Sequence, residues 1–235
     1  MPTLVLQPTI DSFVSQVQAS TNFGLRDMIV HGLVYSGGTK LQWRRGIVNF
    51  DVAALSGAII TSAKLVREVL SVSGAGGVGA RLSRCTRPGE WTESGVTWNT
   101  YDGVNPWTVG GGDIDDATPG KIDYSEPSAT GAHEIAGLEV YIADALANRG
   151  GIVSIMTRLQ NETPGVTQEL NWWSREGANP WRLVVDNERP APGRRSARPD
   201  RAVQTSGVRP SAAGRPAAAG RPARPFGALQ GRESR

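Results

Sequence analysis

Apolar and polar residues alternate over several short stretches within the first 188 residues. In one stretch, Val48, Phe50 and Val52 occupy every second position, which is the period of a strand with one buried face. Further stretches of strand character lie at residues 3–7, 11–15, 28–32, 153–159, 169–175 and 181–186. Glycine, asparagine, aspartate and proline, which favour turns, separate these stretches. The pattern predicts an all-β fold, a β-sandwich of the jelly-roll type.

Two segments interrupt this regularity. Residues 63–71 have the composition of an amphipathic helix, but their β-branched residues and the Ile-Ile-Thr-Ser run before them favour a strand. Residues 74–79 are rich in glycine and open no helix. We therefore expect a strand over 63–71 and a hairpin loop at 74–79.

One helix is predicted in the second half of the chain. Four apolar residues recur there at helical spacing: Ile135, Leu138, Ile142 and Leu146. The Asn-Arg-Gly-Gly run at 148–151 follows them, and glycine commonly ends a helix. The fold is therefore expected to hold a single short helix.

The C-terminal segment 189–235 differs from the rest in charge and composition. Eleven arginines against two acidic residues give it a charge of +9, while 14 basic and 20 acidic residues give 1–188 a charge of −6. The segment also holds 7 of the 15 prolines and few large apolar side chains, so ordering its backbone would gain little burial. We predict a folded domain over 1–188 and a disordered tail over 189–235.

Two interpretations of the tail stay open. It is either a solvated extension without a specific role, or a segment that attaches to a polyanion such as nucleic acid or an acidic surface polymer. Phe226 is its one aromatic residue, and this argues against recognition of bases by stacking.

The chain contains a single cysteine, Cys85, which excludes an intrachain disulfide framework. Residues 1–11 have no basic region and no long apolar stretch, so we expect no secretory signal peptide. We also expect no membrane span, because no apolar run is long enough.

The order of several motifs is similar to that of a known family. The motifs are L6-Q-P-T-I-D-S-F-V14, T21-N-F-G24, I47-V-N-F-D-V52, I59-I-T-S-A-K-L65, W91-T-E-S-G-V-T-W-N99, W172-W-S-R-E-G177 and P180-W-R-L-V184. Over residues 3–187 the chain resembles the DNRLRE-type domain, which is related to carbohydrate-binding module family 96. The resemblance implies a jelly-roll β-sandwich that is not catalytic, serves as an appended surface module and binds acidic polysaccharide.

The chain departs from the family pattern in two places. Thr100-Tyr101-Asp102 replaces the usual residues after the Thr-Trp-Asn motif, and a glycine-rich insertion at 109–116 lengthens the next loop. The module also makes up nearly the whole chain, which weakens the expectation of a secreted appendage.

The family pattern divides the seven tryptophans into two groups. Four fall where it places aromatic residues of the core: Trp91, Trp98, Trp172 and Trp181. The three others, Trp43, Trp107 and Trp173, have no such explanation. A sugar ring needs a flat apolar surface, and an arginine fork suits the carboxylate of a uronate. The predicted carbohydrate-binding residues are therefore Trp43, Arg44, Arg45, Trp107, Trp173 and Arg175, and the alternative is that the three rings are ordinary surface or interface aromatics.

Catalysis has little support in the sequence. His31 and His133 are the only histidines and lie in no metal-ligand spacing, and the chain has no nucleophile elbow, P-loop or dinucleotide fingerprint. We expect no enzyme and no cofactor other than a structural calcium ion, for which Asp11 and Glu176 offer oxygen ligands. The acidic run 113–116 offers oxygen ligands too, but it lacks the EF-hand spacing and is interpreted as a solvated loop.

The leading hypothesis is a non-catalytic carbohydrate-binding or surface-adhesion module. Without a signal peptide, it would act at the surface of a virion, as a bacteriophage tail or decoration protein, or at an extracellular surface. The alternative is a purely structural assembly protein that forms homo-oligomers or virion contacts and whose basic tail contacts nucleic acid or another polyanion. A polysaccharide lyase comes third, because it would need tyrosine, histidine and arginine together in a groove.

Overall fold

The turn residues of the chain separate twelve strands and one α-helix within the described residues, which are 2–36, 40–74, 77–117, 120–162 and 168–189 of a computed structural model. The strands are β1 (Thr3–Leu6), β2 (Ile10–Ser15), β3 (Met28–Ser36), β4 (Lys40–Asp51), β5 (Ile59–Gly74), β6 (Gly79–Cys85), β7 (Ile114–Asp115), β8 (Lys121–Ser125), β9 (Gly131–Ala136), β10 (Ile152–Leu159), β11 (Gln168–Trp173) and β12 (Arg182–Glu188). A 3-10 turn (Ala53–Leu55) follows β4, and the helix is α1 (Glu139–Asn148). The prediction of an all-β fold with one short helix is confirmed.

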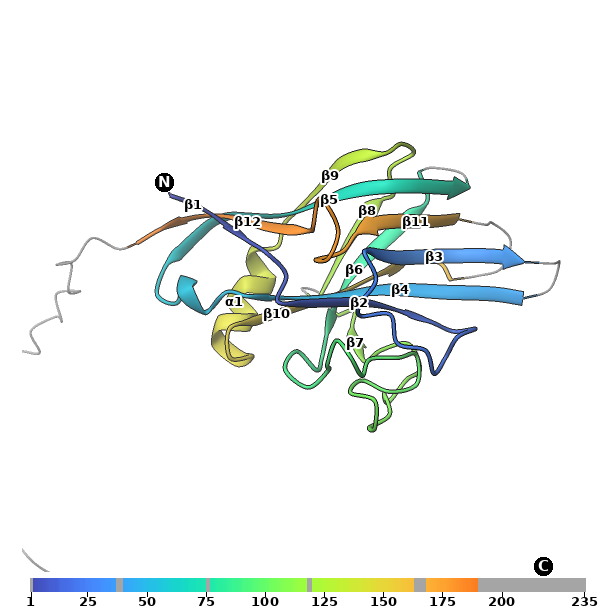
Figure 1. The fold of residues 1–235 in the computed structure, drawn as a ribbon. Helices are drawn as coiled ribbons and strands as arrows, with labels where there is room; N and C mark the ends of the chain where they lie inside the picture. Colours follow the sequence, from blue (N-terminus) through green and yellow to red (C-terminus); the bar gives the residue numbers. More distant parts are fainter. Residues whose placement is uncertain (1, 37–39, 75–76, 118–119, 163–167, 190–235) are drawn as a thin grey trace, which may run out of the picture. The chain divides into compact units, whose positions relative to one another are not determined.

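All strand pairs are antiparallel, and they form one hydrogen-bonded sheet that curls around the core (Figure 1). Two long strands hold it together. β4 pairs with β3 and then β2 along its length, and with β10 over residues that overlap those paired with β2. β5 likewise pairs with β12 and then β11, and with β9 over residues that overlap those paired with β12. The central order β5-β11-β3-β4 places strands side by side that are far apart in the sequence.

The helix begins later than the spacing of apolar residues predicts. Ile135 belongs to β9, and Gly137, with a positive φ of 91°, turns the chain before α1 begins. The buried side chains of α1 include Tyr141 and Ile142. The predicted end is correct, because α1 stops at Asn148 and two glycines of positive φ follow it. Ile135 fits a helix and a strand equally well, since it is buried in either.

Of the two irregular segments, one was predicted correctly. Residues 63–71 lie within β5 and are therefore a strand. The hairpin predicted at 74–79 was wrong, because β5 and β6 are not paired with each other in the part of the chain that the structure describes. Residues 75 and 76 lie outside the described residues, but the strands on either side have different partners: β5 pairs with β11 and β6 with β10.

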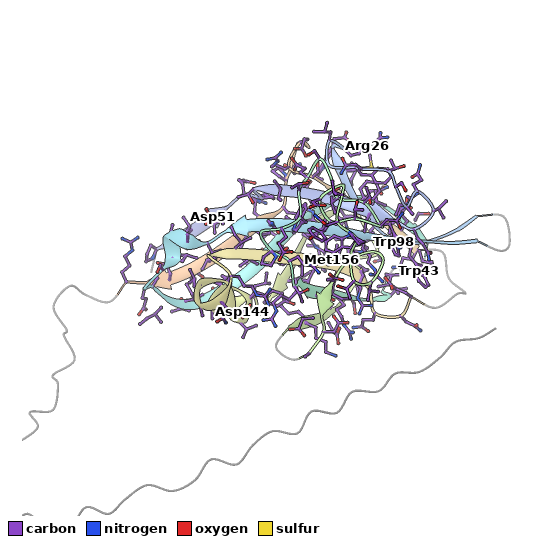
Figure 2. The ribbon with its side chains drawn as sticks, turned by 90° about the horizontal axis from the view of Figure 1, so that it is seen from below. Arg26, Trp43, Asp51, Trp98, Asp144 and Met156 are labelled. Carbon is purple, nitrogen blue, oxygen red and sulfur yellow. The ribbon has the colours of Figure 1, made fainter. Side chains whose placement is uncertain are left out.

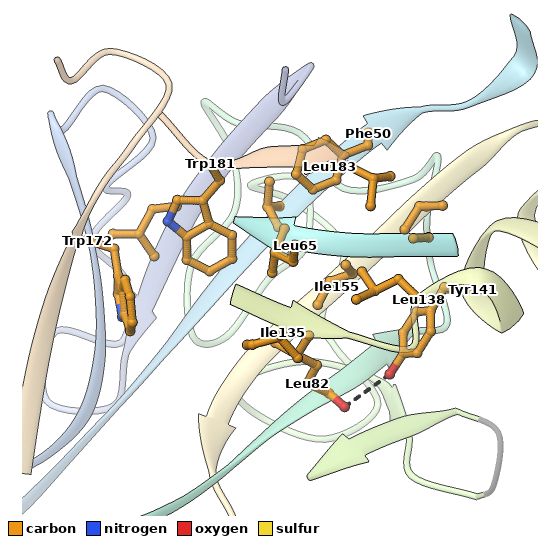
Figure 3. Close-up of a cluster of buried hydrophobic side chains, with 14 of the residues drawn as sticks. Phe50, Leu65, Leu82, Ile135, Leu138, Tyr141, Ile155, Trp172, Trp181 and Leu183 are labelled. Atoms are coloured by element: carbon orange, nitrogen blue, oxygen red, sulfur yellow. Dashed lines mark hydrogen bonds between the residues drawn. The ribbon is translucent and has the colours of Figure 1, made fainter. Parts of the chain in front are cut away.

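The apolar core lies between α1 and the curled sheet. Figure 3 shows side chains of this core, which come from β4, β5, β6, β9, β10, β11 and β12 and from α1 with the residues just before it and before β12. They include Phe50, Leu65, Leu82, Leu138, Ile155 and Leu183. Tyr141 anchors the helix to this core, because its hydroxyl donates to the carbonyls of Leu82 at 3.1 Å and Gly120 at 3.0 Å.

A second buried cluster lies on the other side of β4. Val48 and Phe50 face the apolar core, whereas Ile47 packs with Trp91 and Met156 in the second cluster. The prediction of a strand with one buried face is therefore wrong for β4, which is covered on both faces. Long loops after β6 provide the cover.

Contacts within the chain separate residues 1–193 from residues 194–235. The predicted disordered tail lies outside the described residues from position 190 onward. Within the described ranges, no helix has the length and apolar character that crossing a bilayer requires.

Candidate functional site

One face of the strands β4, β3, β11 and β5 lies opposite to the side that holds Leu170 and Trp172. Its apolar members Met28 and Val30 belong, with Phe13 and Phe23, to the apolar core. On β11, Leu170 and Trp172 are buried, so the alternating residues Glu169, Asn171 and Trp173 project from the opposite side. The register aligns them with residues of the neighbouring strands. We call the aligned set the outward face: Met28, Val30, Arg44, Ser71, Ser73, Glu169, Asn171 and Trp173.

A glycine lets two charges meet across the outward face. Gly32 of β3 lies in register between Arg44 of β4 and Glu169 of β11. Its φ is +132°, and an added Cβ would lie 2.1 Å from the carbonyl oxygen of Gln168, so only glycine fits. With no side chain between them, Arg44 forms an ion pair with Glu169. Their side chains are 21% and 18% exposed, which leaves the pair within reach of a ligand.

The next row of the outward face is polar and uncharged. Asn171 donates its side-chain amide to the hydroxyl of Ser71 at 2.8 Å, and Ser71 and Ser73 are exposed on β5. Amides and hydroxyls both donate and accept hydrogen bonds. This row therefore suits a ligand that carries many hydroxyl groups.

A cavity of about 230 Å³ opens at one end of the outward face. The segment between β2 and β3 forms one wall, and side chains of the outward face form the other. Phe13 and Phe23 are among the lining residues and stack with ring centroids 4.1 Å apart. The lining residues are Phe13, Gln18, Phe23, Arg26, Met28, Val30, Arg44, Glu169 and Asn171. An apolar base with a few polar groups at the rim is typical of small-molecule sites.

The three tryptophans predicted to bind sugar lie in different places. Trp173 is on the outward face and half-buried, with Gly177 packed against its ring. Trp43 is also half-buried and packs against the second cluster. Trp107 is 5% exposed and donates its indole N–H to the carbonyl of Thr97 at 2.9 Å. The prediction for Trp107 requires an open ring face, and the structure places this ring in the second cluster.

Arg45 lies on the opposite side of β4 from Arg44. It is 8% exposed, forms a two-pronged ion pair with Glu162 at 2.9 and 2.6 Å, and stacks over Trp98. Figure 2 shows Trp98 and Met156 of this second cluster, with Trp43 beside them. The side chain also lines a wide hollow of about 450 Å³, together with Arg87 and Arg158. The structure thus separates Arg45 from the residues of the outward face.

Arg175 belongs to a third location, where segments of the motifs converge. Its guanidinium pairs with Glu93 at 2.7 Å and with Glu176 at 2.9 Å, and its backbone N–H donates to Asp11 at 2.6 Å. Asn22 bridges the same region by donating to the carbonyls of Glu93 and Val96. Four segments of the family pattern therefore meet at Arg175: those at 6–14, 21–24, 91–99 and 172–177.

Within the part of the chain that the structure describes, Asp11, Glu93 and Glu176 form a group of carboxylates that could hold a cation. Their carboxylate oxygens lie within 4.8 Å of one another, and oxygen donors of this kind suit calcium. Asp11 and Glu176 were predicted as such ligands, and Glu93 joins them. Burial raises the pKa of Asp11 to about 7, with the nearby carboxylates of Glu176 and Glu93 adding to the effect. Arg175 already supplies one positive charge to this group.

The acidic run 113–116 is bound to arginines. Asp113 accepts from Arg87 at 2.6 Å, Asp115 from Arg84, and Asp116 from Arg81 at 3.2 Å and from Arg158. The interpretation as a solvated loop is therefore wrong for these side chains. The glycines that precede them have a packing role, because any Cβ at Gly110 or Gly111 would lie within 3 Å of the Trp98 ring.

Both histidines lie in a buried polar cluster. Its members come from five strands and the segment after β8: His31, Arg67, Tyr124, Glu126, His133 and Thr157. Glu126 contacts His31 at 2.5 Å and Arg67 at 3.8 Å, and Arg67 stacks on Trp172 at 3.7 Å. Burial alone would raise the pKa of Glu126, but His31 and Arg67 lower it to about 2.

This cluster brings together the residue types that a lyase would use. Arg67 is 1% exposed, Glu126 is 2% exposed and His31 is fully buried. No substrate can reach these three side chains in the folded chain. The cluster is therefore a structural feature of the interior.

The four tryptophans assigned to the core are all buried. Their exposed fractions are 2% for Trp91, 8% for Trp98, and 0% for Trp172 and Trp181. The indole N–H of Trp91 donates to Asn49 at 3.0 Å and to Ser154 at 3.2 Å, which fixes the loop after β6 onto β4 and β10.

Several residues of the candidate site were missed by sequence reasoning. Gly32, Phe13 and Phe23 carried no signal, because their role depends on strand pairing and on the loop that crosses β3. Glu169 and Asn171 did carry a signal in the sequence, since they alternate with buried residues and share a face with Trp173. Polar residues that share a strand face with a half-buried tryptophan were the usable clue.

No curated protein matches the chain. Residues 2–110 match the family model of carbohydrate-binding module family 96, a stretch that runs from β1 through the loop after β6. This protein is thus related to carbohydrate-binding module family 96.

Proposed function

We propose that the chain is a non-catalytic module that binds polysaccharide through the outward face and its cavity. The observation that carries the proposal is the cavity of about 230 Å³, which is lined by the stacked rings of Phe13 and Phe23, by the Arg44–Glu169 pair and by Asn171. An apolar surface next to planar polar groups is what a sugar ring with its hydroxyls requires. The family relation supports a carbohydrate as the ligand.

The extended part of the outward face complements the cavity. On β5, Ser71 lies in register with Asn171 and Ser73 with Glu169, and Trp173 adds a half-buried ring at the end of β11. A polysaccharide is longer than the cavity, so units outside the cavity would lie over these residues. Carbohydrate binding here needs no movement of the strands.

The test is affinity electrophoresis and calorimetry of the full chain with a panel of neutral and acidic polysaccharides. Asn171→Ala and Trp173→Ala should weaken binding to the best ligand. Asn148→Ala, at the end of α1, is the matched control, because Asn148 is also an asparagine with a single side-chain hydrogen bond. Retention of full affinity by both face variants, or no binding to any polymer, would reject the proposal.

A second candidate function concerns the tail and follows from the charge division in the sequence. The +9 charge of 189–235 against −6 for the rest of the chain supports electrostatic attachment of the tail to a polyanion, as in a virion or another surface assembly. This attachment would weaken steeply with salt, whereas sugar binding through uncharged groups would not. Replacing the tail arginines by glutamine should remove the salt-sensitive part alone.

We also propose a location for the protein, namely the surface of a virion or another extracellular surface. Fractionation of the producing cells and of any particles they release, followed by immunoblotting, tests it. Recovery of the protein only in the soluble cell fraction would reject a surface role while leaving the carbohydrate proposal intact.

A further inference from the structure

We infer that the cavity on the outward face receives a single, uncharged sugar unit at the end of a glycan chain. The inference rests on the proposed function, and it concerns the class of sugar and the part of the polymer that the cavity recognises. Three observations carry it: the pairing of the arginines, the size and walls of the cavity, and the chemistry of the Arg44–Glu169 pair.

The arginines predicted to bind a uronate are all engaged with carboxylates. Arg44 pairs with Glu169, Arg45 with Glu162, and Arg175 with both Glu93 and Glu176. A carboxylate ligand at Arg44 would have to replace Glu169 or sit beside it. Like charges so close repel each other, so the site favours a ligand without charge.

The folded part of the chain also has the wrong sign for attracting an acidic polymer. Residues 1–188 carry a charge of −6, and only the tail is strongly basic. At the rim of the cavity, Arg26 is exposed and shows no ion pair in the described residues. One exposed arginine on a surface of net negative charge gives little attraction once salt is present.

The volume of the cavity limits what can enter. At about 230 Å³ it is smaller than the roughly 300–1,000 Å³ typical of sites for drug-sized ligands. Its walls come from two directions: Gln18, Phe23 and Arg26 belong to the loop between β2 and β3, and Glu169 and Asn171 to β11. An internal unit of a polymer needs free space on both sides. A terminal unit needs it on one side only. Ser71 lies beside the lining residue Asn171, and a chain attached to a terminal unit could extend over these two residues.

The Arg44–Glu169 pair provides the hydrogen bonds that neighbouring hydroxyls need. A guanidinium only donates and an ionised carboxylate only accepts. Two adjacent hydroxyls can therefore donate to Glu169 and accept from Arg44 at the same time, while the two charges neutralise each other. Hydrogen bonds of this charge-assisted kind are among the stronger ones.

A matched pair of ligands separates the two classes of sugar. β-Linked mannose and β-linked mannuronate tetramers share the same ring and differ in a hydroxymethyl group against a carboxylate. Calorimetry of the full chain, at high ionic strength to suppress attraction by the tail, should show binding of the mannose or an equivalent glucose tetramer and weaker binding of the mannuronate. Stronger binding of mannuronate that is lost in Arg26→Ala would overturn the inference but leave carbohydrate binding in place.

The variant Glu169→Gln tests the role of the ion pair. It should weaken binding of the neutral tetramer about tenfold, because a charge-assisted acceptor is lost, and should raise the relative affinity for mannuronate, because the negative charge that repels a carboxylate ligand is removed. Glu134→Gln is the matched control: Glu134 pairs with Lys64 at 2.9 Å and does not line the cavity. Equal affinities of the two variants for the neutral tetramer would overturn the inference.

Recognition of chain ends has its own measurement. If the cavity binds a terminal unit, the amount of protein bound per gram of a neutral polysaccharide should rise as the polymer is shortened by limited hydrolysis, in proportion to the number of ends. An amount that stays constant would overturn recognition of ends while leaving the proposed function standing. If no carbohydrate binds at all, the proposed function fails.

Discussion

The apolar core and the buried polar cluster share a strand but are built on different principles. Leu65 and Arg67 are both inward positions of β5 and are 0% and 1% exposed. Leu65 packs among aliphatic side chains (Figure 3), whereas Arg67 contacts Trp172, Tyr124 and Glu126. Burial is equal at the two positions, but the cost of changing a side chain differs, because an unpaired buried charge is far less tolerable than a smaller apolar group.

The difference teaches that an inward position can stabilise the fold without being apolar. The polar cluster ties five strands together through directed contacts, and each contact requires a defined partner. The apolar core depends on volume and is tolerant of conservative exchange. Removing any one partner from the polar cluster should therefore cost most of the free energy that the cluster contributes. In the apolar core, the loss in the free energy of unfolding should grow with the number of atoms removed.

The largest effect is expected from Glu126→Ala. It leaves Arg67 buried without its partner and should cost about 3–5 kcal/mol of the free energy of unfolding. Chemical denaturation of the full chain measures this. The double change Arg67→Met with Glu126→Leu should cost much less than the sum of the two single changes. Additive costs would show that the two groups do not act as a pair.

Acid should affect the polar cluster next. The pKa of Glu126 is lowered to about 2 in the folded chain, against roughly 4.3 when unfolded. Its contribution is therefore present above about pH 4.3 and is lost as the pH falls toward 2, by roughly 3 kcal/mol. Chemical denaturation across this pH range measures the slope of the free energy of unfolding with pH. The control Leu82→Ala should lower that free energy by the same amount at every pH and leave the slope unchanged. A slope unchanged in the double variant at 67 and 126 would contradict the assignment.

Asp11→Asn should act with the opposite sign. The pKa of Asp11 is raised to about 7 by burial, so the folded chain favours its protonated form and loses stability as the pH rises from about 4 through 7. The amide removes this loss and still accepts from the N–H of Arg175, so the variant should be more stable at pH 8 by on the order of 2 kcal/mol. Thermal unfolding at pH 5 and pH 8 would show it.

The stabilising effect of added calcium is a second measurement on Asp11. If Asp11, Glu93 and Glu176 hold the ion, calcium should stabilise the natural chain at pH 8 and have less effect on Asp11→Asn. Equal stabilisation of both proteins would place any bound calcium elsewhere.

In the apolar core, Ile155→Val should cost about 0.5–1.5 kcal/mol, since one methylene is removed from a fully buried side chain. Ile155→Ala should cost more in proportion to the atoms removed. Chemical denaturation of both variants tests whether the loss is graded, and equal losses would indicate that the core collapses instead of leaving a cavity.

The smallest effect is expected at an ion pair on the surface, between β5 and β9. Lys64 and Glu134 form an ion pair at 2.9 Å with side chains 40% and 57% exposed. Lys64→Ala should change the free energy of unfolding by about 0.2–1 kcal/mol, and salt should abolish the difference. A cost close to that of Glu126→Ala would mean that burial does not decide the strength of these pairs.

Much of the fold was predictable because strand alternation is local. The all-β class, the strand at 63–71 and the end of α1 follow from spacing and turn residues within a few positions. The errors arose where one pattern fits two structures. Ile135 is apolar and buried in a strand as well as in a helix, and the glycines at 74–79 suit a crossover as well as a hairpin.

The candidate site was less predictable, because its parts come from distant segments. Arg44 and Trp173 were identified by residue type, and both lie on the outward face. Arg45 and Arg175, chosen on the same ground, lie elsewhere and pair with Glu162, Glu93 and Glu176. Residue type indicates what a side chain can bind, but its partner decides whether it is available.

By itself, the sequence determined the class of fold, the division of charge at residue 188 and the motifs that relate the chain to carbohydrate-binding module family 96, since all three can be read from neighbouring residues. The tertiary structure alone decided which tryptophans are covered and which arginines are neutralised. It also decided that Gly32 lets Arg44 reach Glu169 beside a cavity. The physical reason is that alternation distinguishes the two faces of a strand, whereas the groups that meet each face depend on pairing between strands more than a hundred residues apart.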